Sequence, residues 1–557
     1  MQESEIIPTD HQMVSAKLDW FEFREIKPIF KFNVNRTSAE NLNNFKEEVD
    51  MWIDSLQHHD WDSFSGILKD SMNKYIKKDK INVTHNNQLT KAERTLKKQV
   101  KLINKAGSRL RKIKVASIDM LKDIELQDLY YTVNKRNDIS ISGLRRLKKL
   151  LIQESVAKAQ LELAEEFRDK IQNSVTNFYK KPKDYIKKAL NTLKPKIDLR
   201  KVYDLDDNLE NDPDLVKDII AKYFQNILRP RSFNLSRFLE WKDIYSPVED
   251  IDNKVYESVI SPLLFQEIDE TIRNLLKNKA PGLSGVTYDI IKLLGKRAKE
   301  HLTDVFNFIM VSSAIPKEWK KTSITLIPKK TTWSHKLNDT RPISLIDLMR
   351  KVFTGTINRR FTKVLKDNKI LSEFNFAGLP GQSTMKPLTI VNSVIQAANS
   401  QGKEFWFTSL DIAKAFDSAP IMAIKKSLER INCPNNLTDL FINLLSNRSV
   451  SVNTLFEATD SFLVNNGVEQ GETLSPILWV IFYDLLVTKL AQCPPIRSFT
   501  SPNVLAYMDD LALIADSKKK TERLLSIANE FFEINSLHCN KENDNCLFLK
   551  GVCSESI

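Results

Sequence analysis

The stretch Val504–Ile514 constrains the fold of this 557-residue chain more than any other feature. It reads Val-Leu-Ala-Tyr-Met-Asp-Asp-Leu-Ala-Leu-Ile, an apolar run interrupted by two adjacent acids. The run lacks helical periodicity and a helix cap, so it predicts two short strands joined by a tight turn near Met508 and Asp509, where Asp tolerates unusual backbone angles. Two adjacent carboxylates repel each other, and bound Mg²⁺ would offset that repulsion. For this hairpin alone, a solvated acidic turn is the alternative.

A second acid, Asp411, lies near the end of the strand-like stretch 405–412, which is rich in aromatic and β-branched residues. A helix-compatible stretch, 413–417, begins almost directly after it. Chemistry is usually placed where strands end and loops begin. The sequence therefore predicts that Asp411, Asp509 and Asp510 converge from two neighbouring strands. There they would hold two metal ions about 3.5 to 4 Å apart, the arrangement that clamps attacking and leaving oxygens in phosphoryl transfer.

Three segments with clustered acids and glycines follow one another along the chain, 409–418, 467–476 and 507–510. They resemble, in order, the central motifs of reverse transcriptases, and in particular those of non-LTR retrotransposons of the long interspersed element type. The resemblance covers about residues 275–543. It implies an α+β fold of right-hand polymerase fingers and palm, preceded by a mostly α-helical basic region, with the thumb missing or truncated. It also implies an RNA-directed DNA polymerase that adds deoxynucleotides to a primer 3′-hydroxyl by two-metal catalysis.

The resemblance implies partners, cofactors and site residues as well. The partners are an RNA template, a DNA primer and deoxynucleoside triphosphates, and the cofactors are two Mg²⁺ ions, or Mn²⁺. Lys329 and Arg341 match family residues that touch the incoming triphosphate, where cations offset charge on the leaving pyrophosphate. Phe416 matches the aromatic ring under the nucleotide sugar, which leaves no room for a 2′-hydroxyl. Gln470 and Gly471 match a segment that approaches the nucleotide or template closely, because Gly has no Cβ.

Several positions depart from the family pattern. Ser284 stands where relatives carry Asp, Asn375 where they carry Gln, Ser536 where they carry Gly, and Asn543 where they carry Lys. Relatives use these positions for a turn, a template contact and a general acid for pyrophosphate. Asp417, six residues after Asp411, is expected to make a structural hydrogen bond near a helix start rather than to bind metal.

The first half of the chain is helical and basic in pattern. Apolar residues recur three and four apart over about residues 39–201, which predicts helices. The predicted core positions there are Trp52, Leu56, Trp61 and Phe64. Residues 91–200 hold 28 Lys and Arg against 13 Asp and Glu, a larger excess than the +12 of the whole chain.

Such a concentration of positive charge favours binding to nucleic-acid phosphates. The predicted contacts are Arg145, Arg146, Lys148 and Lys149. The alternative is the solvated face of a long helical hairpin.

These patterns divide the chain into three parts. Residues 1–20 contain Asp10 and His11 in a triplet that resembles the closing motif of an apurinic-type endonuclease domain. We interpret them as a remnant of that domain's C-terminal strand, and an accidental pair in a mobile terminus is the alternative. Residues 21–245 are expected to form a helical basic linker region, and residues 246–557 the reverse transcriptase domain. Little sequence follows the last motif, so we expect a fragment of a longer element product.

Two other functions remain open. One is a catalytically inactive nucleic-acid-binding remnant of the element, and the other is a group II intron maturase, which expects an RNA-splicing domain after the palm. The chain has no signal-type apolar segment and no run of 18 apolar residues, so no membrane association is predicted. Its five cysteines are odd in number, which argues against a disulfide framework and for an intracellular location. The resemblance implies the nucleus.

Overall fold

The computed structural model describes residues 29–53, 56, 61–81, short pieces between 99 and 151, 197, 199–276, 279–329, 333–495, 501–540 and 545–550. The chain separates into two compact units. The first unit is Met1–Ile29 with Ile81–Lys194, and the second is Phe30–Lys80 with Pro195–Ile557. The second unit extends beyond the predicted domain boundary at residue 246, because it also includes residues 30–80 and 195–245.

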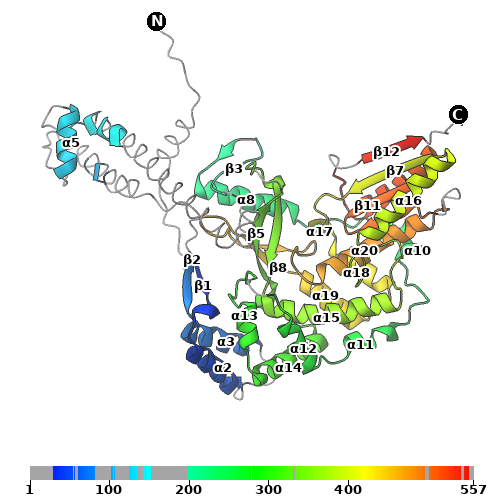
Figure 1. The fold of residues 1–557 in the computed structure, drawn as a ribbon, viewed down its shortest axis with the longest axis horizontal. Helices are drawn as coiled ribbons and strands as arrows, with labels where there is room; N and C mark the ends of the chain where they lie inside the picture. Colours follow the sequence, from blue (N-terminus) through cyan, green and yellow to red (C-terminus); the bar gives the residue numbers. More distant parts are fainter. Residues whose placement is uncertain are drawn as a thin grey trace, which may run out of the picture. The chain divides into compact units, whose positions relative to one another are not determined.

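The described part of the first unit is a small helical cluster around α5, Ile124–Asn134 (Figure 1). Helical residues also occur at 142–144 and 146–151. One apolar cluster gathers Ile103, Ala106, Leu126, Tyr130, Leu144, Leu147 and Leu151. This agrees with the helical pattern expected of the region. Asp10, His11 and the rest of residues 1–20 lie outside the described residues.

The acidic hairpin belongs to a four-stranded sheet, which we name the carboxylate sheet. Its strand order is β10-β11-β7-β12, and every neighbouring pair is antiparallel. The bounds are Val504–Tyr507 for β10, Asp510–Ala515 for β11, Glu404–Asp411 for β7 and Asn545–Lys550 for β12. The two strands of the hairpin and the strand that leads to Asp411 are therefore confirmed.

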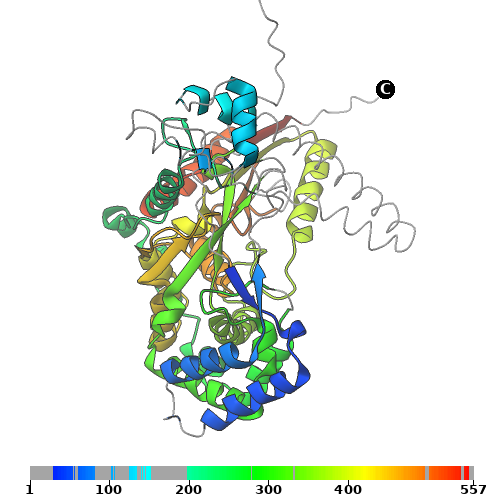
Figure 2. The same cartoon turned by 90° about the vertical axis from the view of Figure 1, so that its left-hand side faces the viewer.

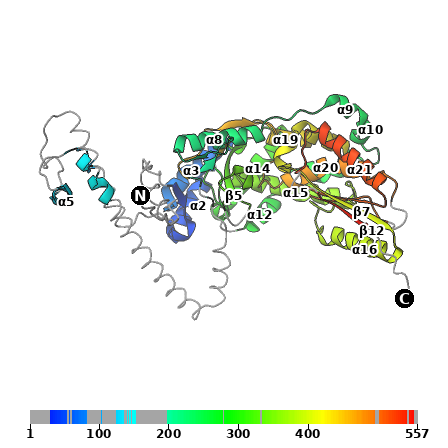
Figure 3. The same cartoon turned by 90° about the horizontal axis from the view of Figure 1, so that it is seen from above.

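Both faces of the carboxylate sheet are covered by helices, as Figure 3 shows. Side chains alternate between the faces because successive residues of a strand point to opposite sides. Phe405, Leu505 and Ile514 form an apolar cluster with residues of α16, and Leu410, Leu511 and Leu513 join the main core, which includes α20 and α21. These helices span Met385–Gln401, Ser475–Ala491 and Lys518–Ile534. Apolar contacts thus hold the sheet on both faces.

A second four-stranded sheet, which we name the mixed sheet, has the order β6-β5-β8-β9. β5 pairs with β6 antiparallel and with β8 parallel, and β8 pairs with β9 antiparallel. The bounds are Lys321–Pro328 for β5, Thr340–Leu345 for β6, Arg448–Val452 for β8 and Phe462–Val464 for β9. Helix α8, Pro213–Ile227, buries Val216, Ile220 and Phe224 against this sheet. Asp212 caps α8 by accepting hydrogen bonds from two backbone N–H groups of its first turn.

The main core lies between helices. At its centre α20 is buried on all sides, since nearly every residue from Ser475 to Leu490 is apolar. The helices around it are α12 (Phe265–Arg273), α13 (Tyr288–Leu293), α14 (Lys296–Ser312), α15 (Leu348–Asp367), α18 (Ile421–Arg430) and α19 (Asn435–Leu445). Short elements complete the unit: β3 (Val202–Tyr203), β4 (Leu209–Glu210), α9 (Leu235–Glu240), α10 (Lys242–Tyr245), α11 (Glu257–Ile260) and α17 (Ala415–Ser418). No helix of the described residues combines the length and the apolar character needed to cross a bilayer.

Two helices from the first hundred residues complete this core. They are α2 (Ala39–Ile53) and α3 (Trp61–Tyr75), flanked by the paired strands β1 (Ile29–Phe32) and β2 (Lys78–Ile81). Figure 2 shows α2 and α3, in blue, against the green helices that include α14. Trp61 and Phe64 are buried as predicted. The prediction for Trp52 is wrong, because this side chain is 48% exposed and lies at the edge of the buried stripe formed by Phe45, Val49 and Ile53.

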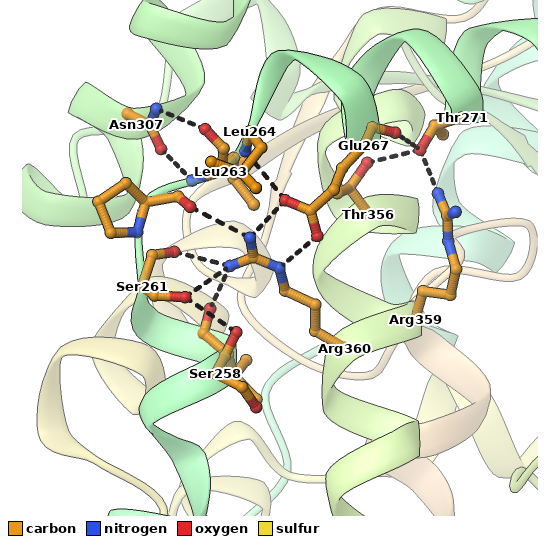
Figure 4. Close-up of polar contacts among 12 residues, drawn as sticks. Ser258, Ser261, Leu263, Leu264, Glu267, Thr271, Asn307, Thr356, Arg359 and Arg360 are labelled. Atoms are coloured by element: carbon orange, nitrogen blue, oxygen red, sulfur yellow. Dashed lines mark hydrogen bonds and ion pairs between the residues drawn. The ribbon is translucent and has the colours of Figure 1, made fainter.

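Two arginines of helix α15 contact residues 261–271, in and just before helix α12 (Figure 4). Arg360 donates hydrogen bonds to both carboxylate oxygens of Glu267 and to the carbonyl oxygens of Ser261 and Pro262. Its neighbour Arg359 contacts the hydroxyl of Thr271. These two cations therefore contribute to the packing of α12 on α15.

Candidate active site

The turn between β10 and β11 holds the two adjacent acids. Tyr507 and Asp510 are cross-strand partners, so Met508 and Asp509 form the two-residue turn. Met508 takes a φ of +55°, in the left-handed region, and its carbonyl oxygen accepts a hydrogen bond of 2.9 Å from the indole of Trp479. The expectation that Asp would take the unusual backbone angles is therefore wrong: Met508 takes them, and a buried tryptophan from α20 stabilises that conformation.

Asp411 and Asp510 are brought together by strand register. They are direct partners across the antiparallel pair of β7 and β11, so their side chains leave the sheet on the same face. Asn540 donates a hydrogen bond of 3.3 Å to a carboxylate oxygen of Asp411 and one of 2.8 Å from its backbone to the Asp411 carbonyl. Asn540 was not among the site residues predicted from the sequence, although it lies between Ser536 and Asn543, two positions compared with the family pattern.

The electrostatics of the three acids favour a bound cation. Burial, together with the nearby charge of Asp411, raises the pKa of both Asp509 and Asp510. Among the described residues, no group of three or more His, Cys, Asp or Glu side chains is arranged to hold a metal ion. Mg²⁺ usually binds one or two carboxylates and completes its shell with waters and substrate phosphates. The pair of carboxylates formed by Asp411 and Asp510 fits that mode of binding.

Lys329 and Arg341 lie together at one end of the mixed sheet. Arg341 on β6 pairs with Ile327 on β5, two residues before Lys329. The Lys329 N–H donates to the carbonyl of Asp339 at 2.8 Å, which closes the turn between the strands. Both side chains are exposed, so each can contact an anion without displacing protein groups.

The segment with Gln470 and Gly471 is anchored to the mixed sheet. The Ser344 N–H donates to the Gln470 carbonyl at 2.8 Å. Gly471 has a φ of +121°, and a Cβ added there would lie 2.8 Å from the Ser344 carbonyl oxygen. Close approach to β6 thus requires glycine, and the Gln470 side chain remains half-buried.

A network of buried ion pairs also anchors the segment with Gln470 and Gly471. Arg350 on α15 is fully buried and forms ion pairs with Glu469, at 2.6 Å, and with Glu472, at 2.7 Å. Thr322 of β5 donates to Glu469 at 2.6 Å. The two acids flank Gln470 and Gly471 in sequence, so the network locks both ends of this short loop. Arg350 was not among the residues for which the sequence predicted a role.

Phe416 joins two of the family-like segments. Its ring is half-buried and meets Trp479 edge to face, with centroids 5.9 Å apart. Its carbonyl accepts from the Val468 N–H at 2.8 Å, and a Cβ on Gly467 would lie 2.7 Å from that carbonyl oxygen. The next residue, Asp417, is buried, and burial raises its pKa to about 7 although Lys414, Arg448 and Arg231 oppose the shift.

Three further predicted positions have internal roles or lie outside the description. Asn375 is buried and donates to the Val480 carbonyl at 3.3 Å, so it is an internal contact. Ser536 bonds to the backbone and hydroxyl of Ser232. Asn543 lies outside the described residues.

The predicted nucleic-acid contacts of the first unit are partly described. Arg146 and Lys149 are exposed and Lys148 is half-buried, while Leu147 between them is fully buried. Arg145 lies outside the residues that the structure describes. The three described cations therefore face away from the apolar cluster of this unit, as either a phosphate-binding or a solvated face would require.

Residues 327–543 match the family described as "Reverse transcriptase (RNA-dependent DNA polymerase)". The chain carries a reverse transcriptase domain. The matched range begins at the end of β5 and includes all three acids, both exposed cations and the Gln470 loop. The mixed helices and strands of this domain agree with the predicted α+β polymerase fold.

Relatives place the domain among the reverse transcriptases of non-LTR retrotransposons, as predicted. The chain is 25% identical over 303 residues to "Probable RNA-directed DNA polymerase from transposon BS" of Drosophila melanogaster, which covers 53% of this chain and 32% of the relative. It is 27% identical over 263 residues to "RNA-directed DNA polymerase from mobile element jockey" of the same organism, which covers 46% and 28%. A third relative is "Retrovirus-related Pol polyprotein from type-2 retrotransposable element R2DM", also of Drosophila melanogaster, at 25% over 279 residues, 49% of this chain and 25% of the relative.

The chain thus spans between a quarter and a third of the length of these relatives. A likeness also exists to the solved chain described as "Structure of apo telomerase from Candida Tropicalis truncated from C-terminal domain". It has 15% sequence identity and a TM-score of 0.32 and covers 48% of this chain and 66% of that chain. A likeness of this size carries no argument about the fold.

Proposed function

We propose that the reverse transcriptase domain is an active RNA-directed DNA polymerase. In this reaction a primer 3′-hydroxyl attacks the α-phosphate of a deoxynucleoside triphosphate opposite an RNA template, and pyrophosphate leaves. The observation that carries the proposal is the register that sets Asp411 opposite Asp510, beside the turn that holds Asp509. Neutral side chains would serve a packed hairpin better, because like charges directly opposite each other destabilise a sheet.

We assign the carboxylate sheet to the palm and the mixed sheet to the fingers. Asp411, Asp509 and Asp510 would hold two Mg²⁺ ions, which stabilise charge on the attacking and leaving oxygens when bound. Lys329 and Arg341, at the exposed end of the mixed sheet, would contact the triphosphate and offset the charge that develops on pyrophosphate.

The remaining residues would select and orient the substrates. The half-buried Phe416 ring would lie under the sugar and exclude a 2′-hydroxyl. Gln470 and Gly471, fixed between β6 and the Arg350 network, would approach the nucleotide or template. The exposed cations Arg146 and Lys149, with their neighbours in the first unit, would bind nucleic-acid phosphates without reading sequence.

Extension of an oligo(dT) primer on poly(rA) with Mg²⁺ tests the proposal on the full chain. We expect the parent to extend the primer and Asp509→Asn to abolish extension. Asp516→Asn is the matched control, because it makes the same change just beyond the far end of β11. If Asp509→Asn extends as well as the parent does, the assignment of the acids is wrong. If the parent binds the template but never extends the primer, the polymerase proposal itself fails.

A further inference from the structure

Lys414 is a cation of the site to which sequence analysis gave no role. It lies three residues after Asp411 and takes a φ of +53°, which is uncommon for a residue with a side chain. The N–H of Ala413, just before it, donates to the His538 carbonyl at 2.9 Å, which ties this turn to the chain segment that also contacts Asp411. A hydrogen bond therefore holds the backbone turn from which the Lys414 side chain extends.

Its partner is a tyrosine from a distant helix. The Lys414 ammonium donates to the Tyr223 hydroxyl at 2.9 Å and lies 4.7 Å from the centre of the Tyr223 ring. Tyr223 belongs to α8, the helix that covers the mixed sheet. The Tyr223 hydroxyl also reaches Asn338, at 3.5 Å, in the turn that precedes Arg341. One phenol thus connects the loop after Asp411 with the turn that carries the exposed cations.

The charge of Lys414 lacks a close carboxylate partner. Among the described residues it forms no ion pair, and its contacts are the hydroxyl and the ring of Tyr223. Lys329 and Arg231 are near enough to disfavour its charge, and only the buried Asp417 favours it. Burial lowers the pKa of Lys414 to about 8. A partly desolvated ammonium on a neutral partner is unfavourable unless an anion joins it.

We propose that Lys414 binds the polyphosphate group of the incoming nucleotide, and that Tyr223 positions it for that contact. Lys414, Lys329 and Arg231 lie near enough for their charges to repel one another, and an anion with several negative charges would offset that repulsion. The Tyr223 hydroxyl directs the ammonium without neutralising it, as a carboxylate would. This inference rests on the proposed function of the site, because it assigns a further residue to the same substrate.

The expected effect is on binding rather than on turnover. Removal of a charged hydrogen bond to phosphate weakens binding by about tenfold. Lys414→Met should therefore raise the KM for deoxynucleoside triphosphate by about this factor and change kcat less than twofold. Tyr223→Phe keeps the ring and removes only the hydroxyl, so its effect should be smaller, about threefold, since a neutral hydrogen bond contributes less.

Calorimetric titration of the full chain with magnesium tripolyphosphate tests the inference without requiring activity. Lys414→Met should bind tripolyphosphate about tenfold more weakly than the parent, in line with one lost charged contact. The matched control is Lys217→Met on α8, the helix that carries Tyr223, because the Lys217 ammonium forms ion pairs with Glu457 and Asp214 at 2.7 and 3.2 Å. This control should bind as the parent does.

Two results overturn the inference. One is unchanged tripolyphosphate affinity in Lys414→Met with an unchanged melting temperature. The other is a loss seen with deoxynucleoside triphosphate but not with tripolyphosphate, which would mean that Lys414 senses the sugar or the base. If Lys414→Met does not fold, Tyr223→Phe decides in the same assay. Failure of primer extension by the parent would remove the proposed polymerase function and leave the tripolyphosphate result standing, so the two proposals fail separately.

Discussion

The carboxylate sheet and the mixed sheet divide the charges of the candidate site between them. The first presents Asp411 and Asp510 as direct cross-strand partners and is covered by helices on both faces. The second ends in the exposed cations Lys329 and Arg341. Strand register holds the acids at close range, where charges interact strongly, whereas the exposed cations act through screened, adaptable contacts. The comparison predicts large effects for changes to the acids and moderate effects for changes to the cations.

The largest effect is expected from Asp510→Asn. Loss of one carboxylate should reduce kcat for primer extension by roughly a thousandfold or more, which is about 4 kcal/mol of the barrier. Stability should stay the same or rise, since burial and Asp411 already disfavour the charge of Asp510. Primer-extension rates together with thermal unfolding measure both quantities. If Asp510→Asn unfolds at a much lower temperature than the parent, its loss of activity would reflect unfolding, and the predicted catalytic role would be contradicted.

The next largest effect concerns the network that joins the Gln470 loop to the mixed sheet. Arg350→Met leaves Glu472 buried without its cation and leaves Glu469 only its 3.9 Å pair with Arg448, which should cost about 3 to 5 kcal/mol of the free energy of unfolding. Replacement of all three residues by apolar side chains of similar volume should restore much of that stability. Urea unfolding measures both. Equal losses in the single and triple variants would show that packing, rather than the unpaired charge, sets the cost.

A moderate effect is expected from Arg341→Ala at the exposed end of the mixed sheet. The KM for deoxynucleoside triphosphate should rise by about tenfold, because one charge-assisted contact to phosphate is lost. The change should shrink at high salt, since exposed charges are screened. Steady-state kinetics at two salt concentrations test this, with Lys336→Ala, an exposed cation of the same turn, as the control. If the rise in KM does not depend on salt, Arg341 does not act as an exposed, screened charge.

Phe416→Val should change selectivity more than overall rate. A smaller side chain opens space beside the sugar, so ribonucleotide incorporation should rise relative to deoxynucleotide incorporation. If Phe416 only packs, its loss would lower stability and leave this preference unchanged. Full truncation to Ala would then lower the free energy of unfolding by about 3 to 5 kcal/mol. Primer extension with each nucleotide type distinguishes the two. A folded, active variant with parental discrimination would refute the steric role.

A pH-dependent effect on stability is expected from Asp417, which lies among cations that include Arg448 of the mixed sheet. Its folded-state pKa of about 7 exceeds the ordinary 3.8, so between these values only the folded state holds the proton. Stability contributed by this proton is complete below about pH 4 and is lost as the pH rises through 7, by at most about 1.4 kcal/mol per unit. Asp417→Asn mimics the protonated acid and should be the more stable protein at pH 8. Parallel pH profiles of melting temperature for the two proteins would contradict this assignment.

Local sequence pattern was sufficient for the elements but not for every detail within them. The interrupted apolar run predicted the hairpin at Tyr507–Asp510, and the aromatic stretch before Asp411 predicted β7. The same pattern placed the strained backbone at an Asp, whereas Met508 takes it because Trp479, from a helix 29 positions earlier, donates to its carbonyl. Trp52 looked like a core residue by spacing, yet it lies at the edge of the buried stripe.

By itself the sequence determined the three family-like segments, their order, the residues they contain and the strand or helix type of each. Side-chain alternation and helical periodicity are local properties, so they can be read without the fold. The tertiary structure alone decided the contacts between distant segments. Asn540 meets Asp411 across 129 positions, Arg350 meets Glu469 across 119, and Lys414 meets Tyr223 across 191. Such pairs depend on how strands register and helices pack, which no local pattern encodes.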